Sequence, residues 1–253
     1  MRLLSAISII LFLSSINASK IEFDRYTIDD GLSQNTVYKV FQDSRGYIWL
    51  GTQGGLDRFN GYEFKHYEHE SNDSTSIVNG WIRAINEDED GLLWLGTVGG
   101  NLGWFDPYDE IGGEIDLFAD HPDFDRPGYI YDILFHGDYI FLTTLGSGLC
   151  RYNRKDGSTL WYSSDSTSKH YIKDRVFTNV YSIDEDKILL GDRSIIILNT
   201  ETNEHVEPYN ELIEKEIGVP FDSIKVSSIT QTNDRKILIG TWSDHGLIIL
   251  DTE

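Results

Sequence analysis

The acidic turns contain the first residues of this sequence that could do chemistry. Asp88-Glu-Asp-Gly91 brings three carboxylates together, and Ca²⁺ prefers such oxygen ligands. The run lacks the remaining ligands of a calcium-binding loop, and the similar run Asp43-Ser-Arg-Gly46 carries an arginine. Asp and Gly also satisfy the backbone geometry of a tight turn without any ion. We therefore expect turns here, and we predict no metal site and no cofactor.

Carboxylates could also act in pairs, as the acid and base of a glycoside hydrolase. The sequence has 42 Asp and Glu residues, but many gather in predicted turns, at 29–30, 87–90 and 184–186. A catalytic pair must instead converge in a pocket that shifts its pKa values. The sequence also shows no Ser-His-Asp pattern, phosphate-binding glycine loop or histidine pair at ligand spacing. We predict no catalytic residue, and a secreted glycosidase or polysaccharide lyase remains the enzymatic alternative.

Amide, aromatic and charged side chains in predicted loops form a third candidate site. Aromatic faces can stack on sugar rings, and amides or arginine can bond to hydroxyl and carboxylate groups. Such a site needs a fold whose loops converge at one end. The predicted ligand-binding residues are Gln34, Asn35, Gln53, Asn79, Trp81, Arg193, Trp242, Asp244 and His245. Trp49 and Trp94 lie within predicted strands instead and are expected in the core.

A repeat with a period near 47 residues indicates which fold positions these loops. Residues 43–55 and 88–100 are identical at eight of 13 positions, and weaker copies follow at 139–144, 188–192 and 237–241. The spacings are 45, 47, 48 and 49 residues between the equivalent positions Gly51, Gly96, Thr143, Gly191 and Gly240. Five units of 47 account for 253 − 18 = 235 residues, the length without the leader described below.

Each repeat has the pattern of short antiparallel strands. The first predicts strands over 37–42, 47–52, 56–59 and 62–67, with a two-residue hairpin turn at Asn60-Gly61. Gly46 and Gly91 are expected in left-handed turn positions, and Gly51 and Gly96 where a neighbouring strand leaves no room for a side chain. A helix is predicted only over 210–217. Four short strands in every repeat are typical of an all-β fold, a β-propeller of about five four-stranded antiparallel blades.

Two segments resemble a known repeat family. Tyr26-Thr-Ile-Asp-Asp-Gly-Leu-Ser-Gln-Asn-Thr-Val-Tyr38 and Gln42-Asp-Ser-Arg-Gly-Tyr-Ile-Trp-Leu-Gly-Thr-Gln-Gly-Gly-Leu-Asp-Arg-Phe-Asn-Gly61 look like the first blade of two-component regulator propellers. The resemblance implies the periplasmic sensor half of a hybrid histidine kinase, as in bacteria of the Bacteroides type. It is close over 21–105, recognisable over 129–152, and reduced to strand pattern and glycine further on. The further blades, β-sandwich, membrane helix, kinase core and receiver of complete family members are not expected in this sequence.

The predicted blades cover residues 29–70, 71–120, 121–165, 166–210 and 211–253. Two arrangements remain open. Residues 19–28 could form the outer strand of the last blade and close the ring, which would leave no long exposed edge. Alternatively, the five blades are the first part of a longer propeller, and the family resemblance favours this second arrangement.

Residues 1–18 have the pattern of a secretory signal peptide. Arg2 precedes an apolar run from Leu3 to Leu13, and small polar residues lead to Ala18. The apolar run is shorter than a membrane-spanning helix, and no second run approaches that length. We expect a periplasmic protein without a membrane span in the mature chain, residues 19–253. Its single cysteine, Cys150, is expected to be buried and unpaired.

Charge excludes some partners. A net charge of −21 repels phosphate backbones, and no basic stripe offsets it, so nucleic acid is not an expected partner. The family resemblance predicts a non-enzymatic sensor that detects an oligosaccharide or other small ligand and signals to a histidine kinase or through a self-dimer. An envelope protein-interaction module is a further alternative.

Overall fold

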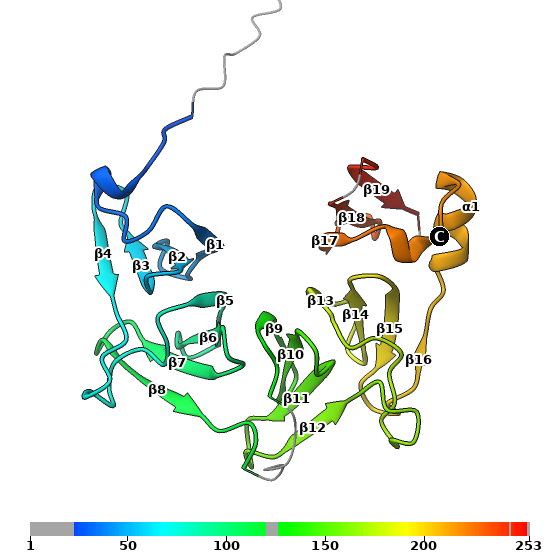
Figure 1. Ribbon diagram of the computed structural model, residues 1–253, viewed down its shortest axis with the longest axis horizontal. Coiled ribbons are helices and arrows are strands. Elements are labelled where there is room, and N and C mark those ends of the chain that lie inside the picture. Colours follow the sequence, from blue (N-terminus) through cyan, green and yellow to red (C-terminus); the bar gives the residue numbers. More distant parts are fainter. Residues whose placement is uncertain (1–22, 120–125, 243, 252–253) are drawn as a thin grey trace, which may run out of the picture.

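The structure, a computed structural model, describes residues 23–119, 126–242 and 244–251, and short antiparallel strands make up almost all of its regular secondary structure. Figure 1 shows five sheets standing around a common centre as the blades of a β-propeller. The first sheet contains β1 (Val37–Gln42), β2 (Ile48–Thr52), β3 (Leu56–Phe59) and β4 (Phe64–Tyr67). The second contains β5 (Ile82–Glu87), β6 (Leu93–Thr97), β7 (Leu102–Asp106) and β8 (Ile111–Ile115). The third contains β9 (Ile130–His136), β10 (Tyr139–Thr144), β11 (Leu149–Asn153) and β12 (Thr159–Tyr162).

The last two sheets complete the arc. They contain β13 (Asn179–Ser182), β14 (Lys187–Gly191), β15 (Ile195–Asn199), β16 (His205–Val206); β17 (Val226–Gln231), β18 (Ile237–Thr241) and β19 (Leu247–Leu250). Each sheet lies within one of the predicted blade ranges, and each blade starts at the centre with its first strand (Figure 1). The predicted helix is confirmed as α1 (Asn210–Ile217), between the fourth and fifth sheets, and two short 3₁₀ turns cover Ile28–Asp30 and Phe221–Ser223.

Apolar side chains fill the space between neighbouring blades. Trp49 and Leu56 of the first sheet pack with Ile85, Leu95 and Phe105 of the second, and all five are at most 2% exposed. Corresponding clusters join the second sheet to the third, the third to the fourth, and the fourth to the fifth. Since burial of apolar surface is the main force that stabilises a fold, these four contact layers hold the blades together.

The repeated aspartate and tryptophan form a structural unit in each of the first two blades. One Asp43 carboxylate oxygen accepts the Arg45 and Tyr47 amides, and the other accepts the Trp49 indole N–H at 2.9 Å. Asp88 bonds to Asp90, Leu92 and Trp94 in the same way. Trp49 and Trp94 are buried, as predicted. Each carboxylate already accepts at least three N–H groups, and Asp43 also accepts the Arg45 guanidinium, which accounts for these acids as parts of turns.

Two glycine predictions are also confirmed. Gly46 and Gly91 have φ of 90° and 84°, in the left-handed region that favours glycine. A Cβ atom on Gly96 would lie 2.6 Å from Cγ2 of Ile130 in the next blade, and one on Gly51 would lie 2.8 Å from the Ile82 carbonyl oxygen. Glycine at these positions lets the second strand of one blade approach the first strand of the next.

The turn between β3 and β4 differs from the prediction. Phe59 pairs with Phe64, so the connection is the four residues 60–63 and not the two-residue turn Asn60-Gly61. The Asn60 side chain accepts the amides of Tyr62 and Glu63 and so closes the longer loop. An asparagine that bonds to the backbone two and three residues ahead stabilises this loop, which the Asn-Gly pattern alone does not reveal.

The two ends of the arc do not meet through the amino terminus. In the described residues the last sheet has three strands, and Tyr26 lies on the first sheet instead, with its ring 5.0 Å from that of Phe59. Residues 23–28 therefore do not supply an outer strand to the last sheet, and 19–22 lie outside the described residues, as does the predicted signal peptide. None of the helices among the described residues could span a membrane.

Both ends of the arc present apolar side chains to solvent. Leu247 of β19 is 59% exposed, whereas the residues at its position in the other four blades, Leu56, Leu102, Leu149 and Ile195, are fully buried. At the other end Val40 is 62% exposed, while its counterpart Ile85 is 2% exposed. The end blades thus present the same kinds of surface that the inner contact layers bury.

Candidate ligand-binding site

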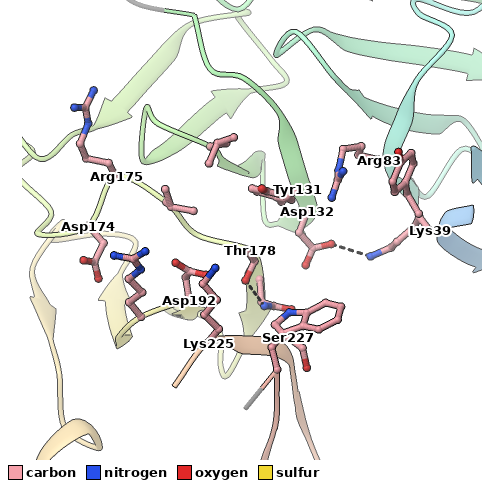
Figure 2. Close-up of a pocket in the computed structure, with 16 residues that line it drawn as sticks. Lys39, Arg83, Tyr131, Asp132, Asp174, Arg175, Thr178, Asp192, Lys225 and Ser227 are labelled. Atoms are coloured by element: carbon pink, nitrogen blue, oxygen red, sulfur yellow. Dashed lines mark hydrogen bonds and ion pairs between the residues drawn. The ribbon is translucent and has the colours of Figure 1, made fainter. Parts of the chain in front are cut away.

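A cavity of about 640 Å³ lies at the centre of the arc, and all five sheets contribute to its lining. Its walls are the beginnings of the first strands, β1, β5, β9, β13 and β17. Its rim is formed by loops that lead into β13 and β17 and by loops between the second and third strands. Figure 2 shows Asp132, Thr178, Asp192 and Lys225 around this space. The predicted ligand site required a fold whose loops converge at one end, and these loops do so.

A β-bulge near the start of the first strand directs one side chain per blade into the cavity. In β1, Val37 pairs with Thr52 and Lys39 with Gly51, so Tyr38 is the extra residue. The same shift in β5, β9 and β17 leaves Arg83, Tyr131 and Ser227 as extra residues. All four line the cavity, and so does Thr178 at the equivalent position before β13. Bulges commonly re-aim a side chain beside a functional site.

Arg83 is held by aromatic rings, and no carboxylate among the described residues pairs with it. Its guanidinium carbon lies 4.5 Å from the Tyr38 ring centre, 4.9 Å from that of Tyr129 and 5.1 Å from that of Tyr131. Burial raises the pKa of Tyr131, although the Arg83 charge opposes this, so the phenol stays neutral at pH 7. The Arg83 side chain is half-buried. The three rings fix its position, and its N–H donors reach the cavity.

An ion pair crosses the cavity wall between non-adjacent blades. Lys39 Nζ of β1 lies 3.0 Å from an Asp132 carboxylate oxygen of β9, and the other oxygen accepts the Val180 amide of β13. The corresponding residue of the intervening strand β5 is the small Ala84. The dashed line between Asp132 and Lys39 in Figure 2 marks this pair. Asp132 therefore connects three blades at the wall of the cavity.

The rim combines a buried acid with exposed cations. Asp192 is 7% exposed, and burial raises the pKa of its carboxyl, while Arg193 and Lys225 oppose that rise and Asp174 adds to it. Asp174 accepts the Ser194 hydroxyl, and Nε of Arg175 donates to the Gly146 carbonyl at 3.1 Å. Trp242 is 78% exposed beside them. The rim thus offers an open aromatic face next to fixed charges.

Two of the predicted ligand-binding residues, Arg193 and Trp242, line the cavity. The other seven do not. Asn35 accepts the Ile28 amide and Asn79 the Trp81 amide, so both hold their own loops. Gln34 accepts the Asn35 amide, Gln53 is half-buried, Trp81 is 36% exposed, and Asp244 and His245 are exposed.

Most of the cavity wall was not predicted from the sequence. The missing residues include Tyr38, Lys39, Arg83, Tyr131, Asp132 and Lys225. All of them except Lys225 stand at or next to one repeat position, the one before the residue that faces the small residue Gly51, Gly96, Thr143, Gly191 or Gly240. Aligning the five repeats on that position would have grouped Tyr38, Arg83, Tyr131, Thr178 and Ser227.

A serine, an aspartate and a histidine do meet in the first blade, but not as a catalytic triad. The Ser33 hydroxyl donates to the buried Asp57 at 2.6 Å, and His66 Nδ1 lies 2.8 Å from the other Asp57 oxygen. His66 Nε2 faces Glu68, also at 2.8 Å. Nucleophilic catalysis needs the histidine next to the serine oxygen, and here the aspartate separates them. Among the described residues, no group of three or more His, Cys, Asp or Glu side chains could hold a metal ion.

Three solved structures with the same fold belong to extracellular or surface proteins of bacteria. The extracellular domain of the hybrid two-component system BT3049 of B. thetaiotaomicron has a TM-score of 0.66 at 18% identity, over 90% of this chain and 35% of its own. The corresponding domain of BT4673 has a TM-score of 0.65 at 18% identity, over 87% and 30%. PorZ, a surface component of the type-IX secretion system of Porphyromonas gingivalis, has 0.62 at 15%, over 85% and 32%. These likenesses establish the fold.

The family relationship comes from the sequence matches. Histidine kinase P4 of Formosa agariphila is 43% identical over 82 residues, which is 30% of this chain and 6% of that kinase. The chain thus spans a small part of this relative and about a third of the structural neighbours. Residues 31–54 and 76–99 match the two-component regulator propeller family. The chain is therefore a β-propeller whose first two blades each contain a segment that matches the two-component regulator propeller family.

Proposed function

We propose that this chain is the ligand-binding sensor propeller of a two-component system and that it acts outside the cytoplasm without catalysing a reaction. The central cavity supports this proposal most strongly. All five blades contribute to it, and its lining combines tyrosine and tryptophan rings with hydroxyl, amide and charged groups. Concave sites with aromatic surface and a few fixed polar groups are typical ligand sites.

The proposed ligand is derived from a carbohydrate. Trp242 gives an open aromatic face for a sugar ring, while Thr178 and Asn179 stand on the wall as hydroxyl and amide partners. The signal would pass to a histidine kinase, because the chain carries repeats of a family associated with such kinases. Secretion into the periplasm through residues 1–18 is part of the same proposal.

A glycan panel tests this function. The purified chain is incubated with plant and host oligosaccharides, and its melting temperature and the reaction products are both measured. Binding without product is expected, and release of shorter oligosaccharides would contradict the sensor function. Trp242→Ala should weaken binding because it removes the open ring. Trp81→Ala shows whether the site extends beyond the cavity to the other predicted residues.

One observation favours an enzymatic alternative. Asp192 is a buried carboxyl with a raised pKa in a cavity that also contains Asp174, and a glycosidase needs such an acid near a second carboxylate. Asp192→Asn distinguishes the two functions: it would abolish product release by an enzyme, whereas a sensor should still bind its ligand.

A further inference from the structure

The charge of the cavity is opposite to the charge of the chain. Five Lys and Arg side chains line it, against three Asp side chains, so its formal charge is 5 − 3 = +2, whereas the whole chain carries −21. Salt at physiological ionic strength screens charges beyond about 8 Å. A ligand inside the cavity therefore experiences the local positive charge more strongly than the distant negative surface.

The cations of the cavity differ in whether they already have partners. Lys39 pairs with Asp132, and Arg175 donates to a backbone carbonyl. In the part of the chain that the structure describes, Arg83, Arg193 and Lys225 have no carboxylate within 4.0 Å and no side-chain hydrogen bond. The acids Asp132 and Asp174 already accept hydrogen bonds from the protein.

Arg83 is the most informative of these cations. A half-buried guanidinium normally finds an acceptor, since an unpaired buried charge is costly. The aromatic rings of Tyr38, Tyr129 and Tyr131 hold it in place but accept no conventional hydrogen bond, and its donors reach the cavity. A planar guanidinium with a fixed position matches a carboxylate or sulfate group through two parallel hydrogen bonds.

We infer that the cavity binds an acidic oligosaccharide, with a carboxylate or sulfate group of the ligand bonded to Arg83. A sugar ring stacks on Trp242 at the rim, and Arg193 and Lys225 attract the ligand and bind further acid groups or hydroxyls. This inference rests on the proposed function, because it specifies the ligand of the same cavity. It adds that charge, and not only shape, decides which sugars bind.

The chain contains a matched control for Arg83. Arg58 also lies over three aromatic rings, 5.0 Å from the Tyr47 centre and 5.8 Å from those of Trp49 and Tyr67. It differs in having a carboxylate partner, Glu110 at 3.8 Å, and in lying outside the cavity. Arg83→Gln and Arg58→Gln therefore both remove a guanidinium from aromatic rings, but only the first should affect the ligand.

The test is calorimetric titration of the full chain with four probes: tetragalacturonic acid, its fully methyl-esterified form, a neutral galactose tetramer and a sulfated disaccharide. We expect the acid to bind and the ester and neutral tetramer to bind at least tenfold more weakly. Binding of the sulfated probe as well would identify a general anion site, and its exclusion a carboxylate site. Loss of a charged hydrogen-bonded pair in Arg83→Gln should weaken acid binding by about tenfold to a hundredfold.

Variants at the rim keep the test valid if Arg83→Gln unfolds. Arg193→Gln with Lys225→Gln changes only exposed side chains, and it should weaken acid binding and reduce its dependence on salt. Arg58→Gln should leave binding unchanged. Equal affinity for acidic and neutral probes, or no binding of any acidic probe, would overturn this inference. The proposed function survives if neutral sugars bind, and fails if no sugar of the wider panel binds.

Discussion

Replacing Asp43 with alanine should destabilise the fold through one buried indole. Asp43 is 4% exposed and Trp49 is fully buried, and their bond is 2.9 Å long. Asp43→Ala leaves the indole N–H without an acceptor, which costs about 1–3 kcal/mol, and removes two amide bonds of the turn worth about 0.5–1.5 kcal/mol each. The expected loss in the free energy of unfolding is therefore about 2–6 kcal/mol, the sum of these contributions.

A double-mutant cycle isolates the contribution of the indole. Urea unfolding is measured for the wild type, Asp43→Ala, Trp49→Phe and the double variant. Trp49→Phe removes the donor, so Asp43→Ala should cost about 1–3 kcal/mol less in that background, the cost of the unpaired N–H group. Asp90→Ala serves as a control because the Asp90 side chain is exposed and only its amide bonds to Asp88. It should change stability by less than about 0.5 kcal/mol.

Two results would refute this reasoning. An equal cost of Asp43→Ala in both backgrounds would mean that the carboxylate does not act through Trp49. A rise in melting temperature on adding CaCl₂ would mean that the acidic turns bind calcium, contrary to the three N–H groups that each of Asp43 and Asp88 already accepts.

Three further predictions follow from burial. Asp192→Asn should raise the melting temperature at pH 7, because the fold raises the pKa of the Asp192 carboxyl and so disfavours its charged form. The gain over the wild type should shrink as the pH falls through the folded pKa, and it should vanish below the ordinary pKa of 3.8. A lower melting temperature of the variant at pH 7 would contradict this prediction. Leu247→Lys with Ile249→Lys should reduce self-association, measured by sedimentation velocity, because the lysines place charge on one apolar end of the arc. Tyr62→Lys, in an exposed turn, should not reduce it. Equal effects of both changes would show that the chain does not associate through this end of the arc. Cys150 is fully buried and burial raises its thiol pKa, so it should react with a disulfide reagent only after denaturation, and rapid reaction of the native chain would show access to the core.

The repeat predicted most of the fold because it reports the same physical constraint several times. Position 96 needs a glycine because Ile130 of the next blade leaves no room for a side chain, and Trp94 needs the aspartate six residues before it as a hydrogen-bond acceptor. Such requirements leave the same residue types at the same spacing. The predicted strand over 37–42 therefore coincides with β1, and the predicted helix with α1.

The cavity wall was harder to predict because a β-bulge breaks the alternation of side chains. A regular strand places every second residue on one face, but the bulge in β5 directs its extra residue, Arg83, toward the centre between the buried Ile82 and Ala84. Sequence alternation does not reveal such a shift. Lys39 of the first blade and Asp132 of the third likewise meet across the second blade, 93 residues apart in the sequence, and only the three-dimensional fold brings them together.

The rim was partly predictable because loops carry binding residues and their position follows from the topology. The repeat places Arg193 and Trp242 in such loops, and both line the cavity. Asn35 and Asn79 have the same residue type as ligand-binding amides, yet their side chains bond to their own loops. Residue type alone does not separate a side chain that stabilises a turn from one that contacts a ligand.

Hydrogen–deuterium exchange with a bound acidic oligosaccharide tests most directly whether the central cavity is the ligand site. We predict that the ligand slows amide exchange in residues 174–179, 192–194 and 225–227, which line the cavity, and leaves the turns at 43–47 and 88–92, at the other end of the blades, unchanged. Slower exchange at those turns, or an unchanged cavity in the presence of saturating ligand, would contradict a binding site at the centre of the propeller.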